Sequence, residues 1–247
     1  MIRAKKRFGQ HFLIDRAVVR KIIEATPDYP KRIVEIGPGL GDLTEALLAK
    51  GNLTAIEIDA ALAATLQKRF AAAIAAGELT LLCADALEAW ENGLASEPYA
   101  IVANLPYYAA TEIILRALRD PLCKSLIVMT QLEMAQKFCA TRNANSLSLL
   151  VRSIGSAELL FEVSKEAFEP APKVESAVIR IVKTQDRYDE GFSRFLKTAF
   201  KTPRKRLASV IQAPIETLEA IGIGKNARAH ELSLEQFKNL YKGLKNG

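Results

Sequence analysis

The stretch Ile33-Val-Glu-Ile-Gly-Pro-Gly-Leu-Gly41 decides the fold. Its first four residues favour a strand, and the glycines that follow let the backbone take positive φ and approach a ligand closely. Asp42 or Thr44 then lies where a helix would begin. A strand, a glycine-rich turn and a helix in this order predict the opening unit of an α/β sheet.

The pattern repeats from Arg32 to about Lys183, where apolar runs alternate with helix-like stretches. This alternation predicts a doubly wound, mostly parallel sheet covered by helices on both faces. The last two runs are joined by a segment too short for a crossover helix, so we expect them to pair as an antiparallel hairpin at one edge. The seven predicted strands are Arg32–Ile36, Leu53–Ile58, Leu79–Cys83, Ala100–Asn104, Ser125–Thr130, Ala157–Val163 and Ala177–Lys183. The alanine-rich segment Ala60–Ala76 predicts one helix, closed by Gly77.

A polar linker at Thr184–Gly191 ends the alternation. Beyond it, apolar residues at helical spacing predict a small helical domain, whose second helix contains Leu207, Val210 and Ile211 and whose last helix begins with a Ser233 and Gln236 capping box. We therefore expect a domain over residues 1–184, with a basic arm at 1–14, and a helical domain over residues 185–247.

Composition narrows the class of protein. The mean hydropathy is +0.06, no run of 18 apolar residues occurs, and the basic start leads into Phe8-Gly-Gln-His rather than an apolar signal region. We expect a cytoplasmic protein without membrane contact. Three widely spaced cysteines and two histidines argue against a disulfide framework and predict no metal site.

Charge is concentrated at the two ends of the chain. Residues 1–32 carry 9 basic and 3 acidic residues, residues 33–184 carry 13 and 18, and residues 185–247 carry 12 and 7. Basic flanks around an acidic body favour a polyanionic partner, although an anionic membrane or a need for solubility would also account for them.

Acidic residues follow the second and third predicted strands. Glu57 stands 20 positions after Gly37, where a carboxylate can accept both hydroxyls of a ribose. The glycine spacing is Gly37-x-Gly39-x-Gly41, with Asp42 in place of the third glycine of the dinucleotide fingerprint, which weakens a nicotinamide-dependent oxidoreductase as the alternative. Asp85 could meet an adenine amino group or cap the following helix.

Asn104-Leu-Pro-Tyr107 follows the fourth predicted strand and places a carboxamide, a rigid corner and an aromatic ring at the sheet edge where ligands bind. By itself the tetrapeptide is equally consistent with a strand end, a turn and a packed tyrosine.

The ordered series of glycine loop, two acids and Asn-Leu-Pro-Tyr resembles the class I S-adenosylmethionine-dependent methyltransferases. The resemblance implies S-adenosyl-L-methionine as cofactor, with Gly37 and Gly39 at its methionine part, Glu57 at its ribose and Asp85 at its adenine. It also assigns Ile58, Ala86 and Asn104 to the cofactor site.

Asn104, Leu105, Pro106 and Tyr107 resemble the catalytic (Asn/Asp)-Pro-Pro-Tyr signature of enzymes that methylate exocyclic amines. An adenine N6 is a poor nucleophile because its lone pair is delocalised into the ring. The Asn104 side-chain oxygen and the Leu105 carbonyl can accept its two N–H bonds and direct the lone pair toward the methyl group. Tyr107 would stack on the extruded base.

Two further segments make the resemblance more specific. Lys5-Lys-Arg-Phe-Gly-Gln-His-Phe-Leu13 and Phe168-Glu-Pro-Ala-Pro-Lys-Val-Glu-Ser-Ala-Val178 are similar to the cofactor arm and the Phe-x-Pro-x-Pro-Lys-Val motif of the ribosomal RNA small-subunit adenine dimethyltransferases. The resemblance implies cofactor roles for Gln10, His11 and Leu13, with His11 in place of the commoner Asn, and makes Phe168 the second wall of the base pocket. Its basic segments imply RNA contacts for Lys5, Lys6, Arg7, Lys201, Arg204, Lys205 and Arg206.

The family implies four methyl transfers to N6 of two adjacent adenosines in the 3′-terminal hairpin of small-subunit (16S) rRNA, and a role in subunit biogenesis. The implied partner is rRNA within a pre-ribosomal particle, and we expect a monomer. A large-subunit (23S) dimethyltransferase of the Erm type and a mainly non-catalytic assembly factor remain alternatives.

Overall fold

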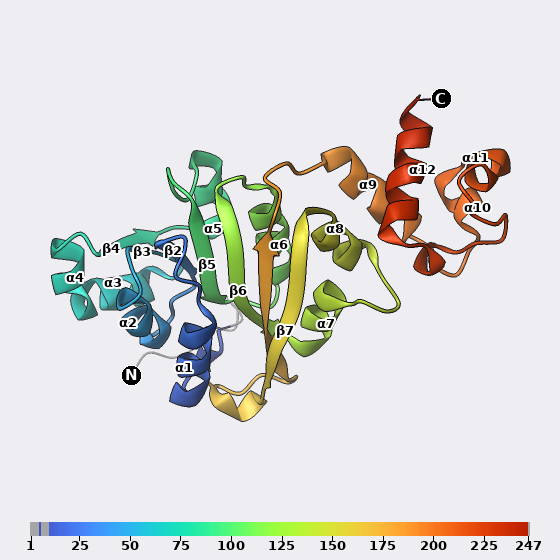
Figure 1. Cartoon of the computed structure of the whole chain (residues 1–247). Helices are drawn as coiled ribbons and strands as arrows, with labels where there is room; N and C mark the ends of the chain where they lie inside the picture. Colours follow the sequence, from blue (N-terminus) through green and yellow to red (C-terminus); the bar gives the residue numbers. More distant parts are fainter. Residues whose placement is uncertain (1–4, 6–9, 247) are drawn as a thin grey trace.

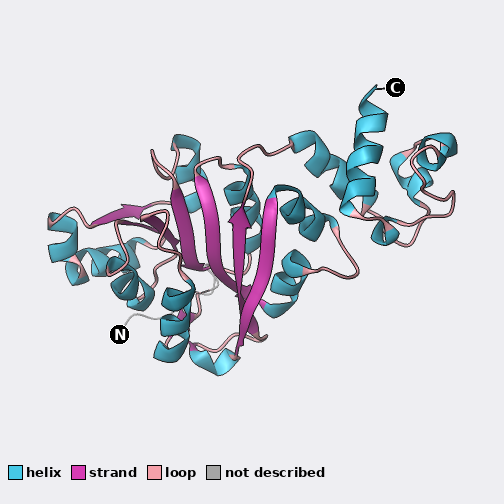
Figure 2. Cartoon of the chain, viewed as in Figure 1, coloured by secondary structure: helices cyan, strands magenta, loops and turns pink. Residues whose placement is uncertain are grey.

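A parallel sheet extended by an antiparallel hairpin forms the centre of the protein (Figures 1 and 2). The computed structural model describes residue 5 and residues 10–246, so the predicted RNA contacts Lys6 and Arg7 lie outside the described residues. The strand order is β4-β3-β2-β5-β6-β9-β7. These strands are β2 (Arg32–Ile36), β3 (Leu53–Glu57), β4 (Leu79–Cys83), β5 (Tyr99–Asn104), β6 (Cys123–Gln131), β7 (Gly155–Val163) and β9 (Ser176–Lys183).

The predicted seven-stranded doubly wound sheet is confirmed, with strand ends that differ by no more than two residues from those predicted. β9 pairs antiparallel with both β6 and β7, so the later strand of the predicted hairpin lies inside the sheet and β7 forms the edge. Parallel pairing of β2 with β3 and β5 brings the carboxyl ends of these strands together, which positions the site.

Two apolar cores lie on opposite faces of the sheet, because successive side chains along a strand point to opposite sides. In β6, Leu126 and Val128 belong to one core, whereas Ile127 and Met129 belong to the other. The first core includes side chains of α5 (Ala86–Ala89), α6 (Ala110–Arg119), α7 (Leu132–Cys139) and α8 (Ser146–Ile154). The second includes side chains of α1 (Arg16–Ala25), α2 (Asp42–Leu48) and α3 (Ala60–Arg69).

The alanine-rich segment forms two helices rather than the single helix predicted. α3 ends at Arg69, and α4 (Ala71–Ala75) begins after Phe70. The Phe70 ring is buried against the Gly41 turn, where a Cβ on Gly41 would lie 2.7 Å from the ring. Docking of this ring interrupts a helix that propensity alone would continue. Gly77 follows with φ +74°, as a helix-terminating glycine should.

A second, two-stranded sheet was not predicted. β1 (Phe12–Leu13) pairs antiparallel with β8 (Phe168–Glu169), with Leu13 opposite Phe168. The pairing brings the amino-terminal segment beside the Phe168 motif, more than 150 positions away in sequence.

Helices make up the carboxy-terminal part, as predicted. They are α9 (Glu190–Ala199), α10 (Leu207–Ile211), α11 (Ile215–Glu219) and α12 (Leu234–Asn246), and they lie to one side of the sheet beyond α8 (Figure 1). The predicted capping box is confirmed: the Ser233 N–H donates to Gln236 Oε1 at 2.9 Å, and the Gln236 N–H donates to Ser233 Oγ at 3.2 Å. The apolar side chains of these helices are continuous with the core around α8.

Within the described residues, none of the helices has the length and apolar character needed to span a membrane. The described part of the chain also has no cluster of three or more His, Cys, Asp or Glu side chains that could hold a metal ion.

Candidate nucleoside and base site

A cavity opens at the carboxyl ends of β2, β3 and β5, where their loops meet the amino-terminal arm. The arm is defined here as the described residues Lys5 and Gln10–Leu13. The predicted catalytic residues Asn104–Tyr107 are called the catalytic corner below, and all four line this cavity. The cavity is also lined by predicted cofactor residues, which are Gln10, His11, Leu13, Gly37, Gly39, Glu57 and Ile58. The structure therefore brings segments from the first 107 residues to one place.

The glycine-rich turn forms one wall of the cavity. Gly37 has φ +70° and Gly39 has φ +60°, a left-handed conformation that L side chains rarely adopt. A Cβ on Gly39 would lie 3.1 Å from the Phe12 ring of the arm. Glycine is therefore needed here both for the backbone conformation and for the close approach of the arm.

Glu57 lies at the end of β3 and is almost fully buried. Its Oε2 accepts from the Gly39 N–H at 3.1 Å and its Oε1 accepts from the Asp59 N–H at 2.9 Å. Burial raises the pKa of Glu57, while these backbone hydrogen bonds oppose the rise. Each carboxylate oxygen has a further lone pair that can accept from a ligand hydroxyl.

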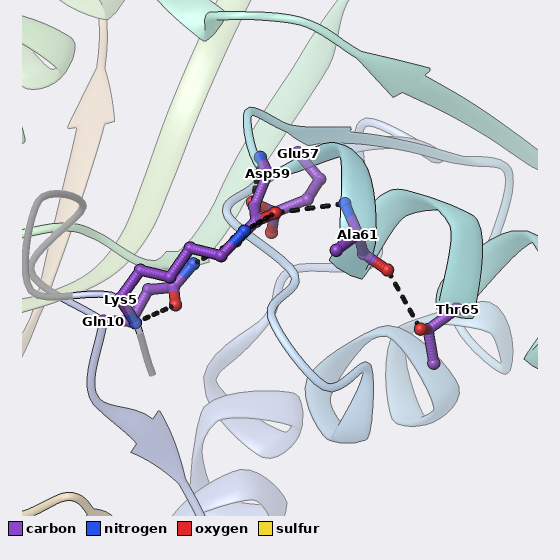
Figure 3. A network of polar contacts seen from close by, with 6 residues as sticks. All are labelled: Lys5, Gln10, Glu57, Asp59, Ala61 and Thr65. Atoms are coloured by element: carbon purple, nitrogen blue, oxygen red, sulfur yellow. Dashed lines mark hydrogen bonds and ion pairs between the residues drawn. The ribbon is translucent and has the colours of Figure 1, made fainter. Parts of the chain in front are cut away.

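Asp59 connects the arm to Glu57 and the start of α3 (Figure 3). It is the N-cap of α3, with Oδ1 accepting from the Ala61 N–H at 3.0 Å. The same carboxylate accepts from Lys5 Nζ at 2.7 Å and from Gln10 Nε2 at 3.3 Å. Lys5, predicted to contact RNA, does not line the cavity but is paired with this acid at its edge.

Glu35 is a cavity-lining acid that sequence reasoning missed. Its side chain is 1% exposed and accepts from Thr44 Oγ1 at 2.7 Å. Burial, with the nearby charge of Glu57, raises the pKa of Glu35 to about 8, against the hydrogen bond from Thr44. An acid two positions before the first glycine of the turn was the available signal.

A second hollow adjoins the first and shares Gly37, Ile58, Pro106 and Tyr108 with it. Asp85, predicted for the adenine, and Ala86, predicted for the cofactor site, line this hollow. Asp85 also caps α5, because its Oδ1 accepts from the Leu87 N–H at 2.7 Å. The two roles considered for Asp85 are compatible in the structure.

Asn104 is the last residue of β5, and a hydrogen bond to the arm fixes the orientation of its carboxamide. Its Nδ2 donates to the His11 carbonyl at 3.1 Å, and since that carbonyl can only accept, the amide nitrogen must face it. Within the described residues Oδ1 makes no hydrogen bond. The corner is held by the Leu105 N–H donating to the Met129 carbonyl at 3.0 Å and by the Ala109 N–H donating to the Pro106 carbonyl at 3.0 Å.

Tyr107 is fixed at both its hydroxyl and its ring. Its Oη lies 2.6 Å from Ser176 Oγ, and burial raises its pKa, against the effect of that hydrogen bond. The ring stacks on His11 with centroids 5.8 Å apart and an interplanar angle of 25°. His11 Nδ1 in turn lies 2.7 Å from the Pro170 carbonyl.

Phe168 is placed differently from the other predicted site residues. It is 3% exposed in the core opposite Leu13 and does not line the cavity, so His11 is the ring that faces Tyr107 in this structure. Ser176 and Tyr108 are further residues at the site that the sequence did not single out.

The predicted RNA contacts of the carboxy-terminal part lie around a separate basic cavity. Arg204, Lys205 and Arg206 line it with Ser209, and Asn226 and Arg228 join them from the segment after α11. Lys201 does not line this cavity. Asn226 and Arg228, which sequence reasoning missed, give it a second wall.

The fold and the cavity define the class as the Rossmann-like methyltransferases. The structure resembles the 23S rRNA methyltransferase ErmE with a TM-score of 0.76 at 25% identity, covering 95% of this chain and 99% of that one. It also resembles a dimethyladenosine transferase from Plasmodium falciparum with a TM-score of 0.83 at 21% identity, covering 96% and 98%.

The sequence narrows this class to one family. The model of the ribosomal RNA adenine dimethylase family matches residues 1–246, and the chain belongs to that family. The predicted family resemblance is therefore confirmed.

Similar proteins named ribosomal RNA small subunit methyltransferase A occur in several bacteria. The protein from Sulfurimonas denitrificans is 45% identical over 97% of this chain and 93% of its own length. That from Campylobacter jejuni is 44% identical over 99% and 96%, and that from Helicobacter hepaticus is 45% identical over 98% and 92%.

Proposed function

We propose that the protein transfers methyl groups from S-adenosyl-L-methionine to N6 of two adjacent adenosines in the 3′-terminal hairpin of small-subunit rRNA, forming N6,N6-dimethyladenosines. The observation that carries this proposal is the orientation of Asn104. With its amide nitrogen held by the His11 carbonyl, Asn104 keeps Oδ1 for an amine donor at the edge of the cavity.

The residues present fit S-adenosylmethionine. The turn at Gly37 and Gly39 is a cradle that side chains would fill, and a Cβ on Gly37 would meet no atom nearer than the Asn104 carbonyl at 4.0 Å. In this proposal the turn, with Gln10, His11 and Leu13 across it, holds the methionine part, Glu57 holds the ribose hydroxyls, and Ile58, Asp85 and Ala86 surround the adenine. When bound, the cofactor supplies an electrophilic methyl group.

The catalytic corner acts on the target amine. Asn104 Oδ1 and the Leu105 carbonyl accept the two N–H bonds of N6 and turn its lone pair toward the cavity. No strong general base is needed, because the proton can leave after the nitrogen has been methylated. Pro106 fixes the turn that sets these two acceptors at one edge.

Tyr107 supplies the stacking surface for the extruded base, with its hydroxyl anchored on Ser176. His11 occupies one side of the Tyr107 ring. We propose Phe168 for the second wall of the base pocket: it is buried here and does not line the cavity, but β8 places it beside β1, whose Leu13 does.

RNA is held by positive charge at the two ends of the chain. Lys5, Lys6 and Arg7 at the amino end and Lys201, Arg204, Lys205 and Arg206 at the other are proposed to contact phosphates, joined by Arg228 in the basic cavity. Such contacts position the substrate without choosing the base. In this proposal residues 1–184 form the methyltransferase domain and residues 185–247 the RNA-binding domain. The protein acts as a monomer on a pre-ribosomal particle in the cytoplasm.

Methyl transfer to purified ribosomal subunits tests the proposal. Labelled S-adenosylmethionine, wild-type protein and separated small or large subunits that lack these methyl groups should give label in small-subunit RNA alone. Label in large-subunit RNA alone would favour the Erm-like function that the likeness to ErmE suggests as the alternative. Calorimetric binding of NAD but not of S-adenosylmethionine would overturn both.

A further inference from the structure

The arm and the cavity wall formed by the glycine-rich turn and Glu57 meet at one carboxylate. Asp59 is 3% exposed, and its side chain accepts from Lys5 Nζ, Gln10 Nε2 and the Ala61 N–H, while its own N–H donates to Glu57 Oε1 (Figure 3). Asp59 does not line the cavity, so it touches the site only through these neighbours.

On the arm side, Lys5, Gln10 and Asp59 are each hydrogen-bonded to the other two. Lys5 contributes its ammonium group to Asp59 and its backbone N–H to Gln10 Oε1 at 2.7 Å, and Gln10 donates to the second oxygen of Asp59. Gln10–Leu13 line the cavity opposite Gly39 and Glu57. Moving the arm away from the cavity therefore requires these contacts to break.

We propose that Asp59 is a positioning residue whose carboxylate, through Lys5 and Gln10, latches the amino-terminal arm over the cavity and thereby slows the release of a bound nucleoside ligand. The proposal rests on the proposed cofactor site. It adds a residue outside the cavity that governs how long the ligand stays.

The chemistry of the latch predicts its sensitivity to salt. Burial opposes ionisation of Asp59, but the hydrogen bonds from Lys5, Ala61 and Gln10 lower its pKa below the ordinary value, so the Asp59 carboxylate is charged at neutral pH. Lys5 is 39% exposed, and ions can therefore screen the pair. Ligand release from the wild-type protein should accelerate with ionic strength.

Asp59→Asn and Lys5→Met isolate the latch. Asn keeps the cap on α3 and the backbone contact with Glu57 but removes the charge that holds Lys5.

The probe is S-adenosylhomocysteine, whose dissociation rate is measured by stopped-flow displacement. Both variants should release it about tenfold faster than wild type, as removal of a charge-assisted hydrogen bond implies. The double variant should be no faster than either one, and Lys5→Arg should restore slow release.

A control is a lysine–carboxylate pair of the same length on the protein surface. Lys137 Nζ lies 2.7 Å from Glu133 Oε1 on α7, and neither residue lines the cavity, so Lys137→Met should leave the dissociation rate unchanged. Thermal melts of each variant separate release from loss of folding. Amide exchange of peptides containing residues 10–13 gives an independent readout, since an unlatched arm should exchange faster.

The possible outcomes distinguish failure of the latch proposal from failure of the proposed methyltransferase function. Tight binding of S-adenosylhomocysteine with equal dissociation rates and equal arm exchange in wild type, Lys5→Met and Asp59→Asn would overturn the latch and leave the proposed function intact. Failure of the wild-type protein to bind S-adenosylhomocysteine would overturn both. Faster release that salt and Lys5→Arg do not modulate would also overturn the latch.

Discussion

Asn104 is the residue on which the proposed chemistry depends. Its amide nitrogen donates to the His11 carbonyl, which leaves its oxygen, the only acceptor of the carboxamide, for the N–H of a target amine. A strand-end asparagine could be recognised in the sequence, but its orientation could not. That orientation depends on a partner 93 positions earlier in the chain.

Asn104→Ala should lower the rate of methyl transfer by ~10²–10³-fold, the effect typical of removing one preorganised polar group at the reacting centre. Single-turnover assays on small-subunit particles measure this rate. Asn104→Asp is the matched comparison: it keeps an acceptor oxygen but cannot donate to His11, so it should retain part of the activity. Wild-type rates in both variants would contradict the role of the carboxamide.

Glu35 makes stability depend on pH. The folded protein holds its proton up to pH about 8, whereas the unfolded chain releases it above the ordinary value of 4.5. The folded state therefore binds more protons between these values, and the free energy of unfolding should fall as pH rises through this window.

Glu35→Gln removes this titration while keeping an oxygen for the Thr44 hydroxyl. Urea unfolding at pH 5 and pH 8 should show wild type losing at least about 1 kcal/mol more than the variant over the interval. Glu57, whose pKa is also raised, is present in both proteins, so its own titration contributes to both pH profiles. Parallel pH profiles would show that Glu35 is ionised in the folded protein.

At the scale of elements, the strands could be predicted because each is a short apolar run bounded by polar or glycine residues. The break between α3 and α4 could not, since alanine propensity favours a continuous helix and the burial of Phe70 against Gly41 is a tertiary contact. β1 and β8 were missed because two-residue strands carry no periodicity. The contacts that join distant segments, Lys5 to Asp59 and Tyr107 to Ser176, likewise have no local signal.

The glycine-rich turn provides a test at this scale. Gly39→Ala should cost about 1–2 kcal/mol of stability for a left-handed backbone and should also push a Cβ against Phe12 of the arm. Gly77→Ala is the control, because its φ is +74° but no atom lies within 4 Å of its Cβ. Both variants should lower the melting temperature, and only Gly39→Ala should weaken S-adenosylhomocysteine binding in calorimetry. Equal binding by both would contradict the proposed cradle.

Across the whole molecule, charge separates substrate binding from chemistry. The sequence predicted basic ends, and the structure gathers Arg204, Lys205 and Arg206 with Arg228 around one cavity in the carboxy-terminal part. This cavity is distinct from the one that holds the catalytic corner. The two functions should therefore be separable by substitution.

Arg206→Gln and Arg228→Gln should weaken binding to small-subunit particles. Each should reduce the slope of log affinity against log salt by about 1 for every phosphate that the arginine neutralises in the wild-type complex. S-adenosylhomocysteine binding should not change. Lys242→Gln removes a charge from an exposed position of α12 and should leave the slope unaltered. Unchanged salt slopes in the arginine variants would place the RNA elsewhere.

The central claim is that this corner dimethylates N6 of two adjacent adenosines in small-subunit rRNA. Mass spectrometry of the 3′-terminal RNA fragment, after wild-type or Asn104→Ala protein has acted on unmethylated small subunits, tests it most directly. The account predicts four added methyl groups, two on each of two neighbouring adenosines, with wild type and a large decrease in product with Asn104→Ala. Equal products from the two proteins, or methyl groups on any other atom, would contradict it.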